Sequence, residues 1–285
     1  MASLNQGPMV SAKGHDNRPI GVFDSGIGGI TVLRALVKDF PKESFIYLGD
    51  TARLPYGSKS PETVKKYLLQ NIKFLISKNV KAIVVACNTA STQIDKISPE
   101  VSFDGVKIYN VIDPGAALAC KVTENKKIAV LATRATISSE SYAKKIKKIL
   151  PEAEVLSQAC PLFVPLAEEG WYEDPVTNLI AFRYLNHLKN SGVDTVVLGC
   201  THYPLLKTAI KKIFGNYVHL VDSGEAISQL LADDFKNGVL NPSEIPQSSL
   251  TIALTDASLQ FETLSNELLC SVMSKQIHFE TVSVI

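Results

Sequence analysis

Short apolar runs rich in β-branched residues alternate along this chain with longer segments whose apolar positions recur at helical spacing. The short runs predict strands at residues 20–24, 44–50, 83–86, 106–112, 127–133, 193–199, 217–221, 250–254 and 277–284. The longer segments predict helices at residues 30–37, 61–75, 91–97, 136–150, 175–189, 225–236 and 258–269. Alternation of buried strands with helices is typical of α/β folds with mostly parallel sheets, so we expect that class.

The pattern of the first half is repeated in the second half. The strand before Cys87 resembles the strand before Cys200, and the strand at 20–24 resembles the one at 127–133. This repetition predicts two similar α/β domains with mostly parallel central sheets, related by a pseudo-twofold axis, with an active site at their interface. The expected division is residues 20–111 plus 222–285 for the first domain and 112–221 for the second.

Proline and glycine predict the interruptions between these elements. Residues 160–170 contain two prolines and are expected to form a loop, and Asp113-Pro114-Gly115 is expected to mark a crossing between domains. Residues 237–249 predict a weak linker. Residues 1–19 are polar without periodicity, so we expect a disordered extension, or a remnant added for expression, outside the fold.

Composition limits the kinds of molecule that this protein is expected to bind. The 285 residues carry 29 basic and 28 acidic side chains, which argues against nucleic acid or an anionic membrane and favours a small-molecule substrate. We find no apolar run of transmembrane length and no signal-peptide core, which favours the cytoplasm. The five cysteines are widely spaced without a CxxC pair, so neither a disulfide framework nor a metal site is expected.

Cys87 and Cys200 are the strongest candidates for chemistry. Each follows a predicted strand end, where parallel sheets bind their ligands, and each precedes polar residues that would stabilise a thiolate. A buried cysteine is otherwise often a small apolar core residue, an interpretation that suits Cys120 and Cys160 better. Two opposed thiols suit inversion of a carbon stereocentre, because one base takes a proton while an acid on the other face returns one.

Other polar residues lie near these strand ends. His202 follows Cys200 closely enough to influence its thiol, and Asp24 ends a neighbouring strand. Glu168 and Glu169 both lie in the predicted loop, and spacing does not separate them. The turn at 26–31 partly matches a dinucleotide fingerprint but has Thr31 at the third glycine, which argues against nicotinamide binding.

Four motifs together identify a resemblance that covers residues 20–284. They are Val22–Gly29, Leu48–Arg53 with Pro55–Gly57, Ala86–Ser91 and Leu198–Leu206. In these segments the chain resembles the glutamate racemases of the aspartate/glutamate racemase family. The resemblance implies interconversion of L-glutamate and D-glutamate without a cofactor or metal, and a supply of D-glutamate for peptidoglycan biosynthesis and cell shape.

The resemblance also implies roles for individual residues. Cys87 and Cys200 would be the bases on opposite faces of the α-carbon, with Asp24 assisting Cys87 and with Glu168 and His202 assisting Cys200. The implied substrate contacts are Asp24, Ser25, Tyr56, Gly57, Asn88, Thr89, Thr136, Thr201 and His202, joined by Thr133. A homodimer is compatible with the resemblance.

Three alternatives remain open on the residues alone. Aspartate or another amino acid would be a rival substrate for the same reaction. A small-molecule binding module with structural or redox-sensing thiols is a rival of another class, and a cysteine hydrolase using Cys200 and His202 is a third.

Overall fold

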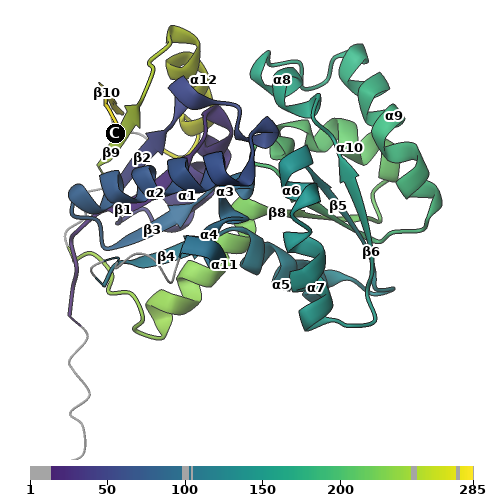
Figure 1. Ribbon diagram of the computed structural model, residues 1–285, viewed down its shortest axis with the longest axis horizontal. Coiled ribbons are helices and arrows are strands. Elements are labelled where there is room, and N and C mark those ends of the chain that lie inside the picture. Colours follow the sequence, from purple (N-terminus) through teal and green to yellow (C-terminus); the bar gives the residue numbers. More distant parts are fainter. Residues whose placement is uncertain (1–13, 98–102, 104, 245–248, 274–276, 285) are drawn as a thin grey trace, which may run out of the picture.

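The computed structural model describes residues 14–97, 103, 105–244, 249–273 and 277–284, which fold into two α/β lobes side by side (Figure 1). The first lobe contains the strands β1 (Ile20–Asp24), β2 (Phe45–Gly49), β3 (Ala82–Val85), β4 (Lys107–Asn110), β9 (Leu250–Leu254) and β10 (His278–Thr281). The second contains the strands β5 (Lys127–Ala132), β6 (Glu154–Ala159), β7 (Thr195–Gly199) and β8 (His219–Asp222).

The two sheets share one topology. The first has the strand order β10-β9-β2-β1-β3-β4 and the second the order β6-β5-β7-β8, and every recorded pairing is parallel. The four strands β2-β1-β3-β4 therefore have the same order as β6-β5-β7-β8, as the repeat in the sequence predicts. The expected α/β class with two mostly parallel sheets is confirmed.

Helices cover both faces of each sheet, so the central strands β1, β3 and β7 are buried along their whole length. The helices near the first sheet are α1 (Ile30–Asp39), α2 (Pro61–Ser77), α3 (Asn88–Ser91), α4 (Ile94–Ile97), α11 (Ser223–Lys236) and α12 (Leu259–Leu269). Those near the second sheet are α5 (Ile112–Val122), α6 (Arg134–Ser138), α7 (Ser141–Ile149), α8 (Phe163–Glu168), α9 (Pro175–Asn190) and α10 (Lys207–Phe214). Helices α1, α11 and α12 pack on one face of the first sheet and α2 packs on the other.

Local sequence explains the helix starts. Ser60 caps α2 by accepting a hydrogen bond from the Thr63 amide, and Pro61 occupies the first helical position, where a missing N–H costs nothing. Asp174 and Pro175 begin α9 in the same way. The predicted helix over 136–150 is divided into α6 and α7 at Glu140, whose φ of 56° interrupts the helical hydrogen bonding.

Several elements differ from the sequence predictions, among them α10, which was not predicted, and α3, which begins before the predicted helix at 91–97. Residues 163–168 form α8 inside the predicted loop, and residues 112–122 form α5 where only a crossing was expected. Both prolines, Pro165 and Pro114, lie in the first turn of their helix, where backbone N–H groups have no intrahelical partner. Strand β6 was not predicted, because it is a half-exposed edge strand without a clear apolar alternation.

The predicted N-terminal extension divides into two parts. Residues 1–13 lie outside the described residues. Residues 14–19 run along the first lobe, where the Asp16 amide donates to the Pro242 carbonyl and the Lys81 amide donates to the Pro19 carbonyl. The Lys81 side chain, paired with Glu43, also donates to the Asp16 carbonyl over 2.8 Å. This segment therefore packs against the first lobe.

We propose that the domains are residues 20–111 plus 222–285 and residues 112–221. Every strand of the first sheet lies in the first set, and every strand of the second sheet lies in the second set except for Asp222, the last residue of β8. Within the described residues, no helix combines the length and apolar composition that crossing a membrane requires.

Candidate active site

A cavity of about 140 Å³ lies between the lobes at the carboxyl ends of their central strands. Its walls include Ser25, Thr133 and Cys200, which directly follow β1, β5 and β7, and Cys87, the second residue after β3. Strand register explains the arrangement, because Phe23 pairs with Val85 and Ala132 pairs with Gly199. Ser25 therefore lies level with Cys87, and Thr133 lies level with Cys200.

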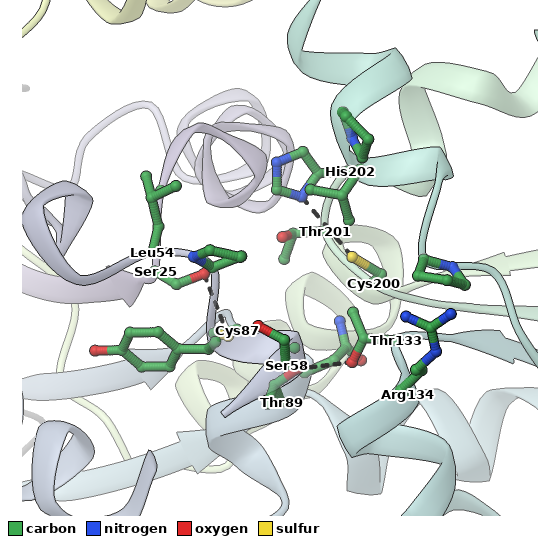
Figure 2. A pocket seen from close by; sticks show the side chains of 18 of the residues that line it. Ser25, Leu54, Ser58, Cys87, Thr89, Thr133, Arg134, Cys200, Thr201 and His202 are labelled. Carbon is green, nitrogen blue, oxygen red and sulfur yellow. Dashed lines mark hydrogen bonds between the residues drawn. The ribbon is translucent and has the colours of Figure 1, made fainter. Parts of the chain in front are cut away.

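Cys87 reaches the cavity from the first lobe and Cys200 from the second, and Figure 2 shows them on either side of it. The Cys87 thiol donates to Ser25 Oγ over 3.8 Å. Burial raises the pKa of Cys87 strongly, and the nearby Asp24 carboxylate raises it further, while the Ala90 amide and the Ser25 hydroxyl act in the opposite direction. These surroundings favour the neutral thiol of Cys87 over its thiolate.

His202 connects Cys200 to Glu168. Its Nδ1 lies 3.8 Å from Cys200 Sγ and its Nε2 lies 3.0 Å from Glu168 Oε1. Burial lowers the pKa of His202, but the hydrogen bonds to Cys200 and Glu168 outweigh burial and raise the pKa to about 10. At neutral pH the imidazole is therefore protonated and lies beside the sulfur of Cys200.

Asp24 lies behind the cavity wall. Its side chain is completely buried at the end of β1, and its carboxylate accepts from the Gly26 amide at 2.9 Å and from the Thr201 hydroxyl at 3.3 Å. Burial raises its pKa, whereas the charge of His202 and these hydrogen bonds lower it. Asp24 thus joins the first turn of one lobe to the residue after Cys200 in the other.

Three threonine hydroxyls form a triangle between the lobes. Thr89 Oγ1 lies 2.9 Å from Thr133 Oγ1 and 3.1 Å from Thr136 Oγ1, and the last two are 3.0 Å apart. Thr89 and Thr133 line the cavity, whereas Thr136 lies behind them and is almost fully buried. Asn88, also in the wall, accepts a 2.7 Å hydrogen bond from the Tyr142 hydroxyl.

The segment 54–58 closes another side of the cavity. Tyr56 is buried and its hydroxyl donates to Asp50, which also receives two 2.8 Å hydrogen bonds from Arg53 Nε. Gly57 lies so close to the second lobe that a Cβ there would come within 2.8 Å of Thr133 Cβ. A side chain at position 57 would push the lobes apart, which explains the glycine.

The structure brings most of the sequence candidates together. Those that line the cavity are Ser25, Tyr56, Gly57, Cys87, Asn88, Thr89, Thr133, Glu168, Cys200, Thr201 and His202. Asp24 and Thr136 do not line it. Glu168 faces the cavity whereas Glu169 is exposed outside it, which separates two residues that spacing did not.

Sequence reasoning missed other wall residues, among them Ser58, Arg134 and Val164. The sequence could have identified Arg134 as a wall residue, because it follows Thr133 at the end of a strand equivalent to β1. The others come from segments that only folding brings to the cavity. Among the described residues, no three His, Cys, Asp or Glu side chains are grouped to hold a metal ion.

Two equivalent sheets that present one thiol each to a shared cavity define an enzyme able to act on both faces of one carbon. A family model described as Asp/Glu/Hydantoin racemase matches residues 20–231. The chain belongs to this family and is therefore a racemase, an isomerase.

Within this family, the chain is similar to individual proteins that are glutamate racemases. The glutamate racemase of Geobacter metallireducens is 46% identical over 253 residues, which cover 88% of this chain and 93% of the relative. The crystal structure of glutamate racemase isoform RacE1 from Bacillus anthracis has a TM-score of 0.87 at 33% identity, covering 95% of this chain and 99% of that chain. The Francisella tularensis glutamate racemase, solved in complex with D-glutamate, has a TM-score of 0.84 at 39% identity, covering 94% and 98%. The resemblance to glutamate racemases predicted from the sequence is confirmed.

Proposed function

We propose that this racemase interconverts L-glutamate and D-glutamate by moving the α-proton between Cys87 and Cys200 through two-base chemistry. The observation that carries the proposal is the equivalent position of the two thiols, which follow β3 and β7 and reach one cavity from opposite lobes (Figure 2). A substrate held between them exposes one face of its α-carbon to each sulfur.

The reaction then needs only a proton relay. The cysteine that is a thiolate takes the proton from the α-carbon, and the electron pair is delocalised into the α-carboxylate. The other cysteine, a thiol, delivers its own proton to the opposite face. After the reaction the two sulfurs have exchanged protonation states, and the reverse reaction restores them.

His202, Glu168 and Asp24 assist this proton relay. His202, protonated and held by Glu168, is placed to exchange a proton with Cys200 or to stabilise negative charge on its sulfur. Asp24 acts through Thr201 and the turn after β1, because its carboxylate is withdrawn from the cavity. We propose that both carboxyl groups position and polarise, and that the sulfurs alone contact the α-carbon.

Hydroxyl and amide groups on the wall hold the substrate in this proposal. Ser25, Asn88, Thr89 and Thr201 would fix the carboxylates and the ammonium group, with Tyr56 and Gly57 closing the far side. Thr136 orients the hydroxyls of Thr89 and Thr133 from behind.

Incubation of L-glutamate with the enzyme in deuterated water tests the two-base mechanism. At early times the D-glutamate formed should carry deuterium at its α-carbon while recovered L-glutamate carries almost none, because different groups remove and deliver the proton. Heavy labelling of recovered L-glutamate, or retention of the original hydrogen in the product, would falsify the mechanism. Parallel assays with L-aspartate test the choice of substrate.

Two wider proposals accompany the reaction. The D-glutamate would serve peptidoglycan synthesis in the cytoplasm, where a reducing environment keeps the free cysteines as thiols.

The second proposal concerns the oligomeric state. A homodimer would bury the apolar side chains Val176, Leu179 and Phe182, which α9 leaves exposed. Sedimentation of the wild type and of the L179E/F182E variant tests this, because the dimer should dissociate in the variant.

A further inference from the structure

Arg134 is a cation of the cavity wall to which neither the family motifs nor the proton relay assigns a role. It begins α6, directly after Thr133, and its side chain is exposed at the cavity (Figure 2). In the part of the chain that the structure describes, no ion pair or hydrogen bond engages its guanidinium. The charge is therefore available to a ligand that enters.

A charge count shows what this cation does for the cavity. Glu168 contributes one negative charge and protonated His202 one positive charge, so these two cancel. The relay requires one cysteine to be a thiolate, which leaves the wall with a negative charge. Arg134 is the wall residue that offsets it. Without Arg134, the cavity would repel an amino acid that carries two carboxylates and one ammonium group.

The shape of the site makes this charge effective. Leu54, Pro161, Val164 and Pro165 contribute apolar atoms to the cavity wall, and low-dielectric walls of this kind weaken solvent screening and focus the field of a charge. Arg53, which precedes the segment 54–58, is not available in the same way, because Asp50 engages its guanidinium. Among the residues that line the cavity, Arg134 is therefore the cation that no carboxylate of the wall offsets.

We infer that Arg134 is a specificity residue that captures anionic substrates at the cavity mouth and favours amino acids with an acidic side chain. This inference rests on the proposed glutamate racemisation. Arg134 acts on substrate capture and not on proton transfer, because it is not part of the chain of contacts that joins Cys200, His202 and Glu168. Its removal should therefore affect KM much more than kcat.

The test compares R134Q with R183Q, which removes the same charge from an exposed position on α9 outside the cavity. At low ionic strength, kcat/KM of R134Q for L-glutamate should fall about three- to tenfold through KM, with kcat changed less than about twofold. The difference should shrink at about 0.5 M salt, where the Debye length is a few ångströms. R134K should recover most of the loss, and R183Q should match the wild type.

Inhibition constants add a measurement that is independent of turnover. Loss of one charge should weaken binding of the dianion glutarate more than binding of the monoanion butyrate, because the electrostatic energy scales with ligand charge. Equal weakening of both, or an R134Q variant with the salt dependence of the wild type, would overturn the inference. A wild-type enzyme that does not racemise glutamate would overturn the proposed function instead, so the two failures are distinguishable.

Discussion

The Nε2 atom of His202 lies 3.0 Å from Oε1 of Glu168, and these residues come from different elements of the second lobe. The other nitrogen of the same ring lies 3.8 Å from Cys200 Sγ. One imidazole therefore links a carboxylate to the thiol. This link is why the pKa of His202 rises to about 10 despite complete burial.

The first prediction concerns the pH dependence of stability. A histidine whose pKa rises from 6.5 to about 10 on folding stabilises the protein fully below pH 6.5, and the stabilisation is lost as the pH rises toward 10. The free energy of unfolding of wild type minus that of H202Q should therefore be largest near pH 6 and decline steadily above it. Urea unfolding of both proteins at several pH values measures the difference. A difference that grows with pH would contradict the ionic link.

The second prediction concerns the two cysteines. C87S and C200S should each lower the rate of racemisation by about a thousandfold or more, because a serine hydroxyl is a far weaker acid and base near neutral pH. C270S, which changes an exposed cysteine, is the matched control and should keep full activity. Circular dichroism assays of the two enantiomers give the rates. Substantial activity in either single variant would exclude the paired mechanism.

The third prediction concerns the support of the segment 54–58. Y56F removes the hydroxyl that donates to Asp50, so the segment should loosen and KM for glutamate should rise about three- to tenfold, equivalent to about 1 kcal/mol. T255V is the control, because it also removes a hydroxyl that donates to Asp50, over 3.1 Å, but from outside the cavity. Steady-state kinetics of both variants should show the rise only in Y56F. An equal rise in both would indicate general destabilisation.

The fourth prediction concerns the contact between the lobes at Gly28. A Cβ at this position would lie 2.4 Å from both His202 Nδ1 and Thr201 Oγ1, which is closer than non-bonded atoms approach. G28A should displace the ring of His202 and lower kcat/KM by about a hundredfold, the order expected for misplaced catalytic groups. Kinetics together with a thermal melt check this. A stable G28A enzyme with unchanged kcat/KM would show that His202 tolerates displacement.

Local patterns determined much of this architecture in advance. Buried parallel strands must be continuous and apolar, so the ends of β3 and β7 could be read directly, and with them the positions of Cys87 and Cys200. The repeat of these strands predicted two sheets of similar order. The motifs around them carried the resemblance to the racemase family that the comparisons confirm.

Two predictions that were based on proline were wrong. Pro114 and Pro165 argued against regular structure, yet each lies in a first helical turn, where an absent N–H breaks no hydrogen bond. The start of a helix such as α8 depends on what its apolar side chains meet, and Phe163 packs against Tyr184 and Tyr203 of distant segments. A local pattern does not contain that information.

The sequence by itself therefore determined the buried strands, their repetition and the two thiols at their ends, because each depends on residues that are neighbours in the chain. Only the tertiary structure decided that Glu168 faces the cavity and Glu169 does not, that Asp24 and Thr136 stand behind the wall, and that Arg134 lies at the mouth. These relationships depend on how the lobes meet. The physical reason is that burial and charge pairing arise from contacts between segments far apart in the sequence.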